Sequence, residues 1–151
     1  MIGKKYSSDD QVLSRLRRVK FNYPKVVQHG LDIEAILDDF KRDTVEDHFD
    51  DYALDEDDWW KTLTMNAAGA KTFTLPAVTV AEIGLWVEFI KKGAGKLTVQ
   101  ASGPDKINDS AAGGTVYNDL AEETSAMIKL KVIAAGEWSI SYFTGSGWRT
   151  S

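Results

Sequence analysis

The chain has 151 residues, of which 43% are hydrophobic and 27% charged, values that are typical of a soluble globular protein. It contains no cysteine, which excludes a disulfide scaffold, a thiol nucleophile and any metal site built on thiolates. No stretch approaches the ~18 apolar residues of a membrane span, and the first residues lack the apolar core of a signal peptide. We therefore expect a protein made in a cytoplasm, with no membrane partner.

The net charge of −5 hides a strong asymmetry along the chain. Residues 1–30 carry 7 basic and 2 acidic side chains, residues 31–60 carry 2 and 13, and residues 61–151 carry 9 and 8. A division of this kind suggests an electrostatic partner for one end, either another protein or a neighbouring subunit. A solvated acidic surface is the alternative. The basic segment is short and the whole chain is acidic, which argues against a nucleic-acid partner.

The first sixty residues are predicted to form helices and loops. A first helix is expected after Ser8, which fits a capping box with Gln11. Its apolar stripe and the basic residues around it are Val12, Leu13, Leu16, Val19, Arg15, Arg17 and Arg18. A second amphipathic helix is expected after Asp32, and a weaker third one over residues 44–52. Because short helices are marginal in water, their apolar faces are expected to dock on the rest of the protein or on another protein.

The hydrophobic period changes from 3.6 to 2 at Trp59 and Trp60. This change predicts a domain boundary near residue 60, with a helical docking arm over 1–60 and a β-domain over 61–151. The two tryptophans either fasten the arm to the β-domain or face a partner, since tryptophan is enriched at interface hot spots. Neighbours on a strand point to opposite faces, so one of the two is expected in the core.

Three units of strand, glycine-containing tip and strand follow, over residues 63–75, 85–101 and 126–142. Each unit is typical of a β-hairpin. Repeated hairpins without helices between them predict an antiparallel β-sandwich or barrel of about seven to eight strands.

The sequence offers few groups for catalysis. Two isolated histidines, His29 and His48, do not make a zinc site, and Ser146 lacks the outer glycines of a nucleophile elbow. The loop over 93–96 lacks the first glycine and the Ser or Thr of a phosphate loop, and the acidic run over 50–58 lacks the glycine of an EF-hand. We predict no catalytic residue, cofactor or bound metal. The acidic segment over 38–58 is expected to attract cations loosely or to dock a basic partner.

Residues 62–151 resemble the small β-domains of tailed-bacteriophage virion proteins of the tail-fibre, head-fibre or capsid-decoration type. The stretches that carry the resemblance are 72–76, 84–99, 107–108, 128–131, 136–140 and 145–148. Asp109 stands where these domains often have a glycine. The resemblance implies a non-enzymatic structural protein of the virion, present in the host cytoplasm during assembly. It also implies a homotrimer that is attached to capsid or tail proteins by its N-terminal part, with a host-surface glycan as a further candidate partner.

The residues expected to dock on a partner are Val12, Leu13, Leu16, Val19, Arg15, Arg17, Arg18, Trp59 and Trp60. Two other functions stay open. A carbohydrate-binding module would need two or more tryptophans that lie coplanar on an exposed surface. An enzyme would need a carboxylate pair at the separation that glycosidases use, drawn from Glu82, Glu88, Asp105, Asp109 and Asp119.

Overall fold

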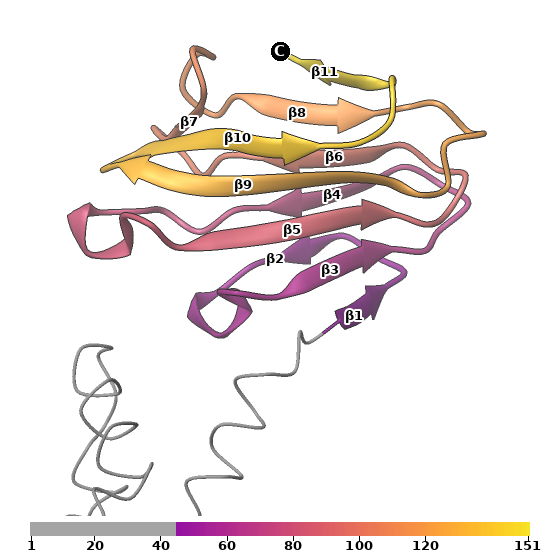
Figure 1. Ribbon diagram of the computed structural model, residues 1–151, viewed down its shortest axis with the longest axis horizontal. Helices are drawn as coiled ribbons and strands as arrows, with labels where there is room; N and C mark the ends of the chain where they lie inside the picture. The colour runs from indigo at the N-terminus through magenta and orange to yellow at the C-terminus, as the bar shows by residue number, and fades with distance from the viewer. Residues whose placement is uncertain (1–44) are drawn as a thin grey trace, which may run out of the picture. The chain divides into compact units, whose positions relative to one another are not determined.

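The computed structural model describes residues 45–151, which form two facing β-sheets (Figure 1). Sheet A contains, in spatial order, β1 (Val45–His48), β3 (Thr62–Met65), β5 (Trp86–Lys91), β9 (Ala126–Ala134), β10 (Glu137–Phe143) and β7 (Lys106–Ile107). Sheet B contains β11 (Trp148–Thr150), β8 (Thr115–Asn118), β6 (Leu97–Gln100), β4 (Lys71–Thr74) and β2 (Tyr52–Ala53). Two 3₁₀ helices complete the list, η1 (Glu56–Asp58) and η2 (Val80–Glu82). The expectation of a mainly β protein is confirmed, and the two sheets are compatible with the sandwich alternative. Residues 61–151 contain nine strands, β3 to β11, where about seven to eight were expected.

From β1 to β6 the chain alternates between the sheets, and each strand lies beside the next strand of its own sheet, so this part of the chain forms stacked coils (Figure 1). In sheet A, β1 is parallel to β3 and β3 is parallel to β5. In sheet B, β2 is parallel to β4 and β4 is parallel to β6. The remaining pairs are antiparallel, except for the short parallel pair of β7 with β10.

The prediction of purely antiparallel sheets is therefore wrong, and so are two of the three predicted hairpins. The tip over 66–70 connects β3 in sheet A to β4 in sheet B, and the tip over 92–96 connects β5 to β6 in the same way. Only β9 and β10 form the expected hairpin. The physical reason is that alternation of polar and apolar residues reports one buried face, whichever direction the neighbouring strand runs.

Glycines let the two tips lie directly on each other. The backbone N–H of Gly95 donates to the carbonyl oxygen of Ala67 at 3.0 Å. A Cβ atom on Gly95 would overlap the carbonyl of Gly69, and one on Gly93 would overlap the backbone of Ala67. Absence of a side chain is thus required at both positions for the coils to stack.

A second repeated feature lies where the chain returns from sheet B to sheet A. Asp55 forms a capping box with Asp58 around η1, and Thr79 forms one with Glu82 around η2. Each short helix is followed by an extended residue and then by one with positive φ, Trp60 at 67° and Gly84 at 93°. The same turn therefore occurs in two successive coils.

Within the described residues, the β-fold already includes residues 45–60, which lie before the boundary that was expected near residue 60. Strands β1 and β2 lie in the segment predicted as a weak helix over 44–52, and they pair with β3 and β4. The inward residues of β1, Glu46 and His48, are polar. The hydrophobic pattern of the sequence therefore does not show the period of 2 that marks a strand. The helices predicted after Ser8 and Asp32 lie outside the described residues.

The core lies between the sheets and is apolar from the second coil onward. Its fully buried side chains include Leu63, Phe73, Phe89, Leu97, Ile107, Ile128, Leu130 and Trp138. Burial of each such side chain contributes roughly 1.5–3 kcal/mol to folding, so the core needs no metal or disulfide. Among residues 45–151, no helix has the length and apolar character to cross a membrane.

Candidate functional site

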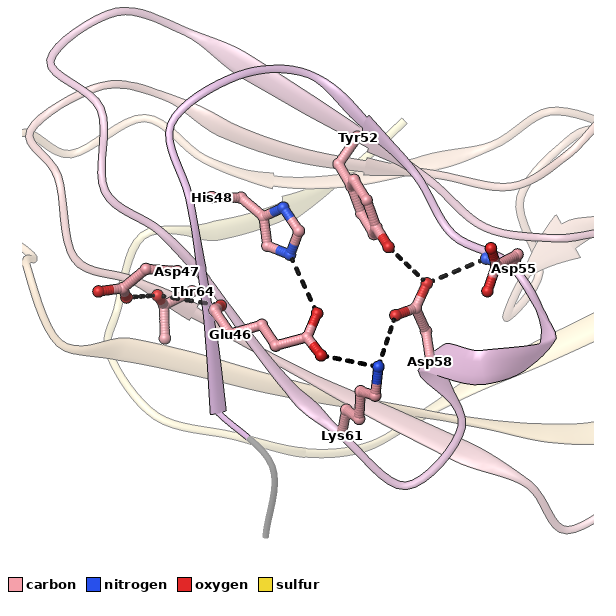
Figure 2. Close-up of polar contacts among 8 residues, drawn as sticks. All are labelled: Glu46, Asp47, His48, Tyr52, Asp55, Asp58, Lys61 and Thr64. Carbon is pink, nitrogen blue, oxygen red and sulfur yellow. Dashed lines mark hydrogen bonds and ion pairs between the residues drawn. The ribbon is translucent and has the colours of Figure 1, made fainter.

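The most connected polar group of the described residues lies where the stack of coils begins (Figure 2). We call it the end cluster, and it consists of Glu46, His48, Tyr52, Asp58 and Lys61. Strand β1 supplies the first two residues, β2 supplies the tyrosine, and the turn around η1 supplies the last two. Since β1 and β2 are the edge strands of sheets A and B, the end cluster lies at the same end of both sheets.

Asp58 is the centre of the end cluster and is only 1% exposed. Its carboxylate accepts hydrogen bonds from the Tyr52 hydroxyl and from the backbone N–H of Asp55, both at 3.0 Å. The Lys61 ammonium lies 3.5 Å from Asp58 and 2.7 Å from Glu46. Burial of a carboxylate costs free energy unless its oxygens accept hydrogen bonds, and the Asp58 oxygens do so. The Asp58 side chain can therefore be buried and hold the turn around η1.

The surroundings of the end cluster raise the pKa values of two of its members, Tyr52 and Lys61. Burial, together with the hydrogen bond to Asp58, raises the pKa of Tyr52 to about 12. The hydrogen bond to Glu46 raises the pKa of Lys61 above its usual value. Both groups therefore stay protonated at neutral pH, where a catalytic base would have to lose its proton.

His48 is the member whose polar atoms are least used. Its ring packs on Tyr52 with centroids 4.0 Å apart and meets Phe73 edge-on at 5.5 Å. Its buried Nε2 atom lies 3.8 Å from a carboxylate oxygen of Glu46 and makes no hydrogen bond. The histidine fills space beside two aromatic rings, as expected for a packed residue.

The register of the strands explains why polar residues gather at this end. Glu46 is paired with Leu63 in the next coil, His48 with Met65, and Tyr52 with Phe73. The first coil thus places polar side chains at positions that are apolar in the second coil, and the core ends there. Charges that point inward on an edge strand also disfavour the addition of a further strand.

A buried lysine, the last residue of β5, connects two loops of the β-domain. Lys91 has no exposed surface, and its ammonium donates to the carbonyl oxygens of Gly93, Leu120 and Glu123 at 3.0, 2.8 and 3.3 Å. Burial lowers the pKa of Lys91. Three carbonyl acceptors nevertheless satisfy all its donors and join the tip after β5 to the loop after β8.

The Glu123 carboxylate connects the loop between β8 and β9 to the loop between β10 and β11. It accepts from the Ser146 hydroxyl and the Ser146 backbone N–H at 2.7 Å, from Asn118 at 2.7 Å and from the Gly147 N–H at 3.1 Å. These bonds, above all that from the Ser146 hydroxyl, lower the pKa of Glu123 to about 2. Ser146, which the sequence analysis considered as a nucleophile, therefore donates hydrogen bonds that attach its loop to Glu123.

The five tryptophans form two contacting pairs, Trp59 with Trp138 and Trp60 with Trp86, and one further residue, Trp148. Trp138 is fully buried and stacks on Trp59 with centroids 5.6 Å apart and planes 22° apart, and Trp148 packs against the core. Trp60 is 49% exposed and meets the ring of Trp86 edge-on, at 88°. One tryptophan of the 59–60 pair thus packs inward and the other lies at the surface, as the sequence suggested.

The exposed aromatic pair does not have the geometry expected of a sugar platform. The rings of Trp60 and Trp86 are nearly perpendicular, and the Lys129 ammonium lies 3.8 Å from the Trp86 ring centroid. The coplanar pair that would favour a carbohydrate-binding module is therefore not formed by these two residues.

Four of the five carboxylates considered for an enzyme, all but Asp109, are used in separate contacts. Glu82 caps η2, Glu88 accepts from Thr62 at 2.9 Å, and Asp105 accepts from the Val78 N–H at 2.9 Å. Asp119 lies 3.6 Å from Arg149. Within residues 45–151, no group of three or more His, Cys, Asp or Glu side chains is placed to hold a metal ion.

Of the predicted docking residues, Trp59 and Trp60 are described above, and those between Val12 and Val19 lie outside the described residues. Sequence reasoning missed the end cluster and Lys91. The capping spacing of Asp55 and Asp58 was a signal for the first. The alternation from Val87 through Phe89 to Lys91 was a signal for the second, because it places the lysine on the buried face. No protein-family model matches the chain, and no curated protein matches it.

Proposed function

We propose that the chain is a non-enzymatic structural protein of a bacteriophage virion. Its β-domain is the outward module and associates into an oligomer, with a trimer as the expected state. The segment before Val45 attaches the module to capsid or tail proteins. The resemblance of residues 62–151 to virion β-domains supports this assignment, together with the use that the fold makes of its ionisable groups.

That use of ionisable groups is the observation that carries the proposal. Asp58, Lys91 and Glu123 each form three or more hydrogen bonds, and each joins segments that are distant in sequence or closes a turn. Loops that are fastened to one another in this way suit a rigid component of a particle. Enzymes more often place such groups in loops that receive a substrate.

The position and charge of the N-terminal segment support its role in attachment. The first described strand, β1, is an edge strand of sheet A, and 44 residues precede it in the sequence. Residues 1–30 carry the excess of basic side chains, while the carboxylates from Glu46 to Asp58 lie in the β-domain. An acidic surface on the particle would attract residues 1–30, in competition with the acidic side chains of residues 31–60 of the same chain.

The test is binding of the purified full chain to phage particles stripped of it. We expect binding to weaken as salt rises, because the Debye length falls from ~10 Å at 0.1 M to ~3 Å at 1 M. The triple change Arg15→Glu, Arg17→Glu, Arg18→Glu should slow attachment and leave the circular dichroism of the β-domain unchanged. Arg149→Glu is a control on the exposed strand β11 and should bind like the parent.

Binding that is unaffected by salt and by the triple change would assign attachment to the apolar stripe of residues 12–19. Failure of the full chain to bind any component of the particle would contradict the proposed function.

A further inference from the structure

A cavity of about 280 Å³ lies between the last edge strands of the two sheets. Strand β7 is an edge of sheet A and β11 is an edge of sheet B, on the side away from β1 and β2 (Figure 1). Strand β7 and the loop after it supply four lining residues, and β11 with the residue after it supplies two. The lining residues are Ile107, Asn108, Asp109, Ser110, Thr150 and Ser151. The cavity therefore lies at the opposite end of the domain from the end cluster.

Hydrogen bonds hold the loop that forms one wall of the cavity. The Asn108 backbone N–H donates to the carbonyl oxygen of Trp138 at 2.7 Å, and the Asn108 Oδ1 atom accepts from the Ile140 N–H at 3.0 Å. The Ser110 hydroxyl closes the turn by accepting from the Ile107 N–H at 3.0 Å. The wall is thus attached to β10 before a ligand arrives, which lowers the cost of binding one.

Three polar groups of the lining have no partner among residues 45–151. The Asp109 carboxylate accepts no hydrogen bond and forms no ion pair there, and the Thr150 hydroxyl makes no hydrogen bond. The side-chain NH₂ group of Asn108 is the third, since the Oδ1 atom is the one that β10 occupies. Together they offer a charged acceptor, a donor of two protons and a hydroxyl that can do both. Asp109 and Thr150 are exposed, so a molecule from solution can reach them.

This set of groups fits the hydroxyl groups of a neutral sugar. A sugar hydroxyl donates one hydrogen bond and accepts others, so a carboxylate and an amide on consecutive residues can together bind two neighbouring hydroxyls. The cavity is smaller than the ~300–1,000 Å³ of sites for drug-sized ligands, which suits a single sugar residue. An anionic ligand would meet the charge of Asp109, and a divalent cation would find only one carboxylate in the lining.

We propose that this cavity binds one residue of a neutral glycan, with Asp109 as the main acceptor and with Asn108 and Thr150 as further hydrogen-bonding groups. The inference rests on the proposed function for the source of the glycan, which is the surface of the host cell. Strand β1 follows the attaching segment in the sequence, and the cavity lies at the other end of the stack of strands. A module attached through that segment keeps the cavity available to the host.

The test is saturation-transfer difference NMR on the purified full chain. The neutral probes are the methyl glycosides of glucose, galactose, mannose and N-acetylglucosamine, and the anionic probe is N-acetylneuraminic acid. We expect at least one neutral glycoside to bind with a Kd on the order of 1 mM, and the anionic probe to give no signal.

Two variants at the cavity and one elsewhere locate the binding. Asp109→Ala should raise the Kd at least about tenfold, because it removes a hydrogen bond to a charged acceptor. Thr150→Val keeps the shape of the side chain and should raise the Kd about threefold. Glu122→Ala is the matched control, since Glu122 is also exposed and lines a second cavity of about 280 Å³. It should bind like the parent. Circular dichroism checks that each variant is folded.

A parent chain that binds none of the neutral glycosides at 10 mM, roughly ten times the expected Kd, would overturn the proposal. Binding of the anionic probe alone would overturn the class of ligand. Binding that survives Asp109→Ala and is lost in Glu122→Ala would overturn the location. Each of these failures would leave the assignment to a virion intact, because that assignment is tested on particles.

Discussion

Trp60 and Gly84 occupy the same position in two successive turns, and both have positive φ, at 67° and 93°. The left-handed conformation costs a non-glycine residue roughly 1–2 kcal/mol. The turn of the first coil therefore carries a strain that the turn of the second coil avoids.

A pair of variants at Trp60 isolates that strain. Trp60→Gly and Trp60→Ala both remove the ring and its contact with Trp86, but only alanine keeps a Cβ atom in the left-handed conformation. We expect the glycine variant to be more stable than the alanine variant by about 1 kcal/mol. Urea unfolding at a concentration where both are monomeric provides the measurement. Equal stabilities would mean that the backbone of residue 60 is not strained.

The neighbouring lysines of the tip after β5 provide a second comparison. Lys91→Met leaves three buried carbonyl oxygens without their donor, and we expect a loss of about 3 kcal/mol of unfolding free energy. Lys92→Met removes an exposed ion pair with Asp47 and should cost less than about 1 kcal/mol. Thermal and urea unfolding of the two variants test the difference. A Lys91→Met protein as stable as the Lys92→Met protein would show that the buried ammonium does not hold the loops.

The sequence predicted the layers of this fold but not the direction of its strands. Alternation over residues 85–101 and 126–142 identified four strands correctly, because inward residues such as Val87, Phe89, Leu130 and Val132 are apolar. The same alternation occurs in parallel and antiparallel strands, so the glycine-containing tips were interpreted as hairpins. The first coil escaped detection because its inward residues, Glu46 and His48, are polar where an apolar residue would have shown the period.

Stacking of the tips predicts opposite effects at two glycines. A side chain on Gly95 would overlap the carbonyl of Gly69, whereas a Cβ on Gly69 meets no atom within 4 Å. Gly95→Ala should destabilise the protein by about 2 kcal/mol or more, since the tips must separate. Gly69→Ala should be neutral or slightly stabilising, because it restricts the unfolded chain. Differential scanning calorimetry would contradict the stacked-coil arrangement if the two variants melted alike.

Glu123 should make stability depend on acid pH. Its folded pKa of about 2 lies below the ordinary value of 4.5, so its contribution is fully present above about pH 4.5. It is lost as the pH falls towards 2. Glu123→Gln, which cannot accept all four hydrogen bonds, should be less stable than the parent at pH 7. The gap should close between about pH 4.5 and 2 in unfolding experiments. A gap that stays constant over this range would show that the Glu123 charge does not bind the last loop.

The inclusion of residues 45–60 in the β-fold predicts how truncations behave. Residues 43–151 form one compact unit, so a chain of these residues should give a β-type circular dichroism spectrum and a cooperative melt. A chain of residues 61–151 lacks β1, β2 and the ring of Trp59 that stacks on Trp138, and it exposes Leu63 and Phe73. It should bind a hydrophobic dye and aggregate. Equal melting of the two chains would place residues 45–60 outside the folding unit.

The proposed assignment to a virion is tested most directly by quantitative mass spectrometry of particles, purified by density gradient, of a phage whose genome is found to contain the reading frame. The account predicts peptides of this chain at a constant molar ratio to the major capsid or tail protein through repeated purification. A chain that is abundant in the lysate and absent from the purified particles would contradict it.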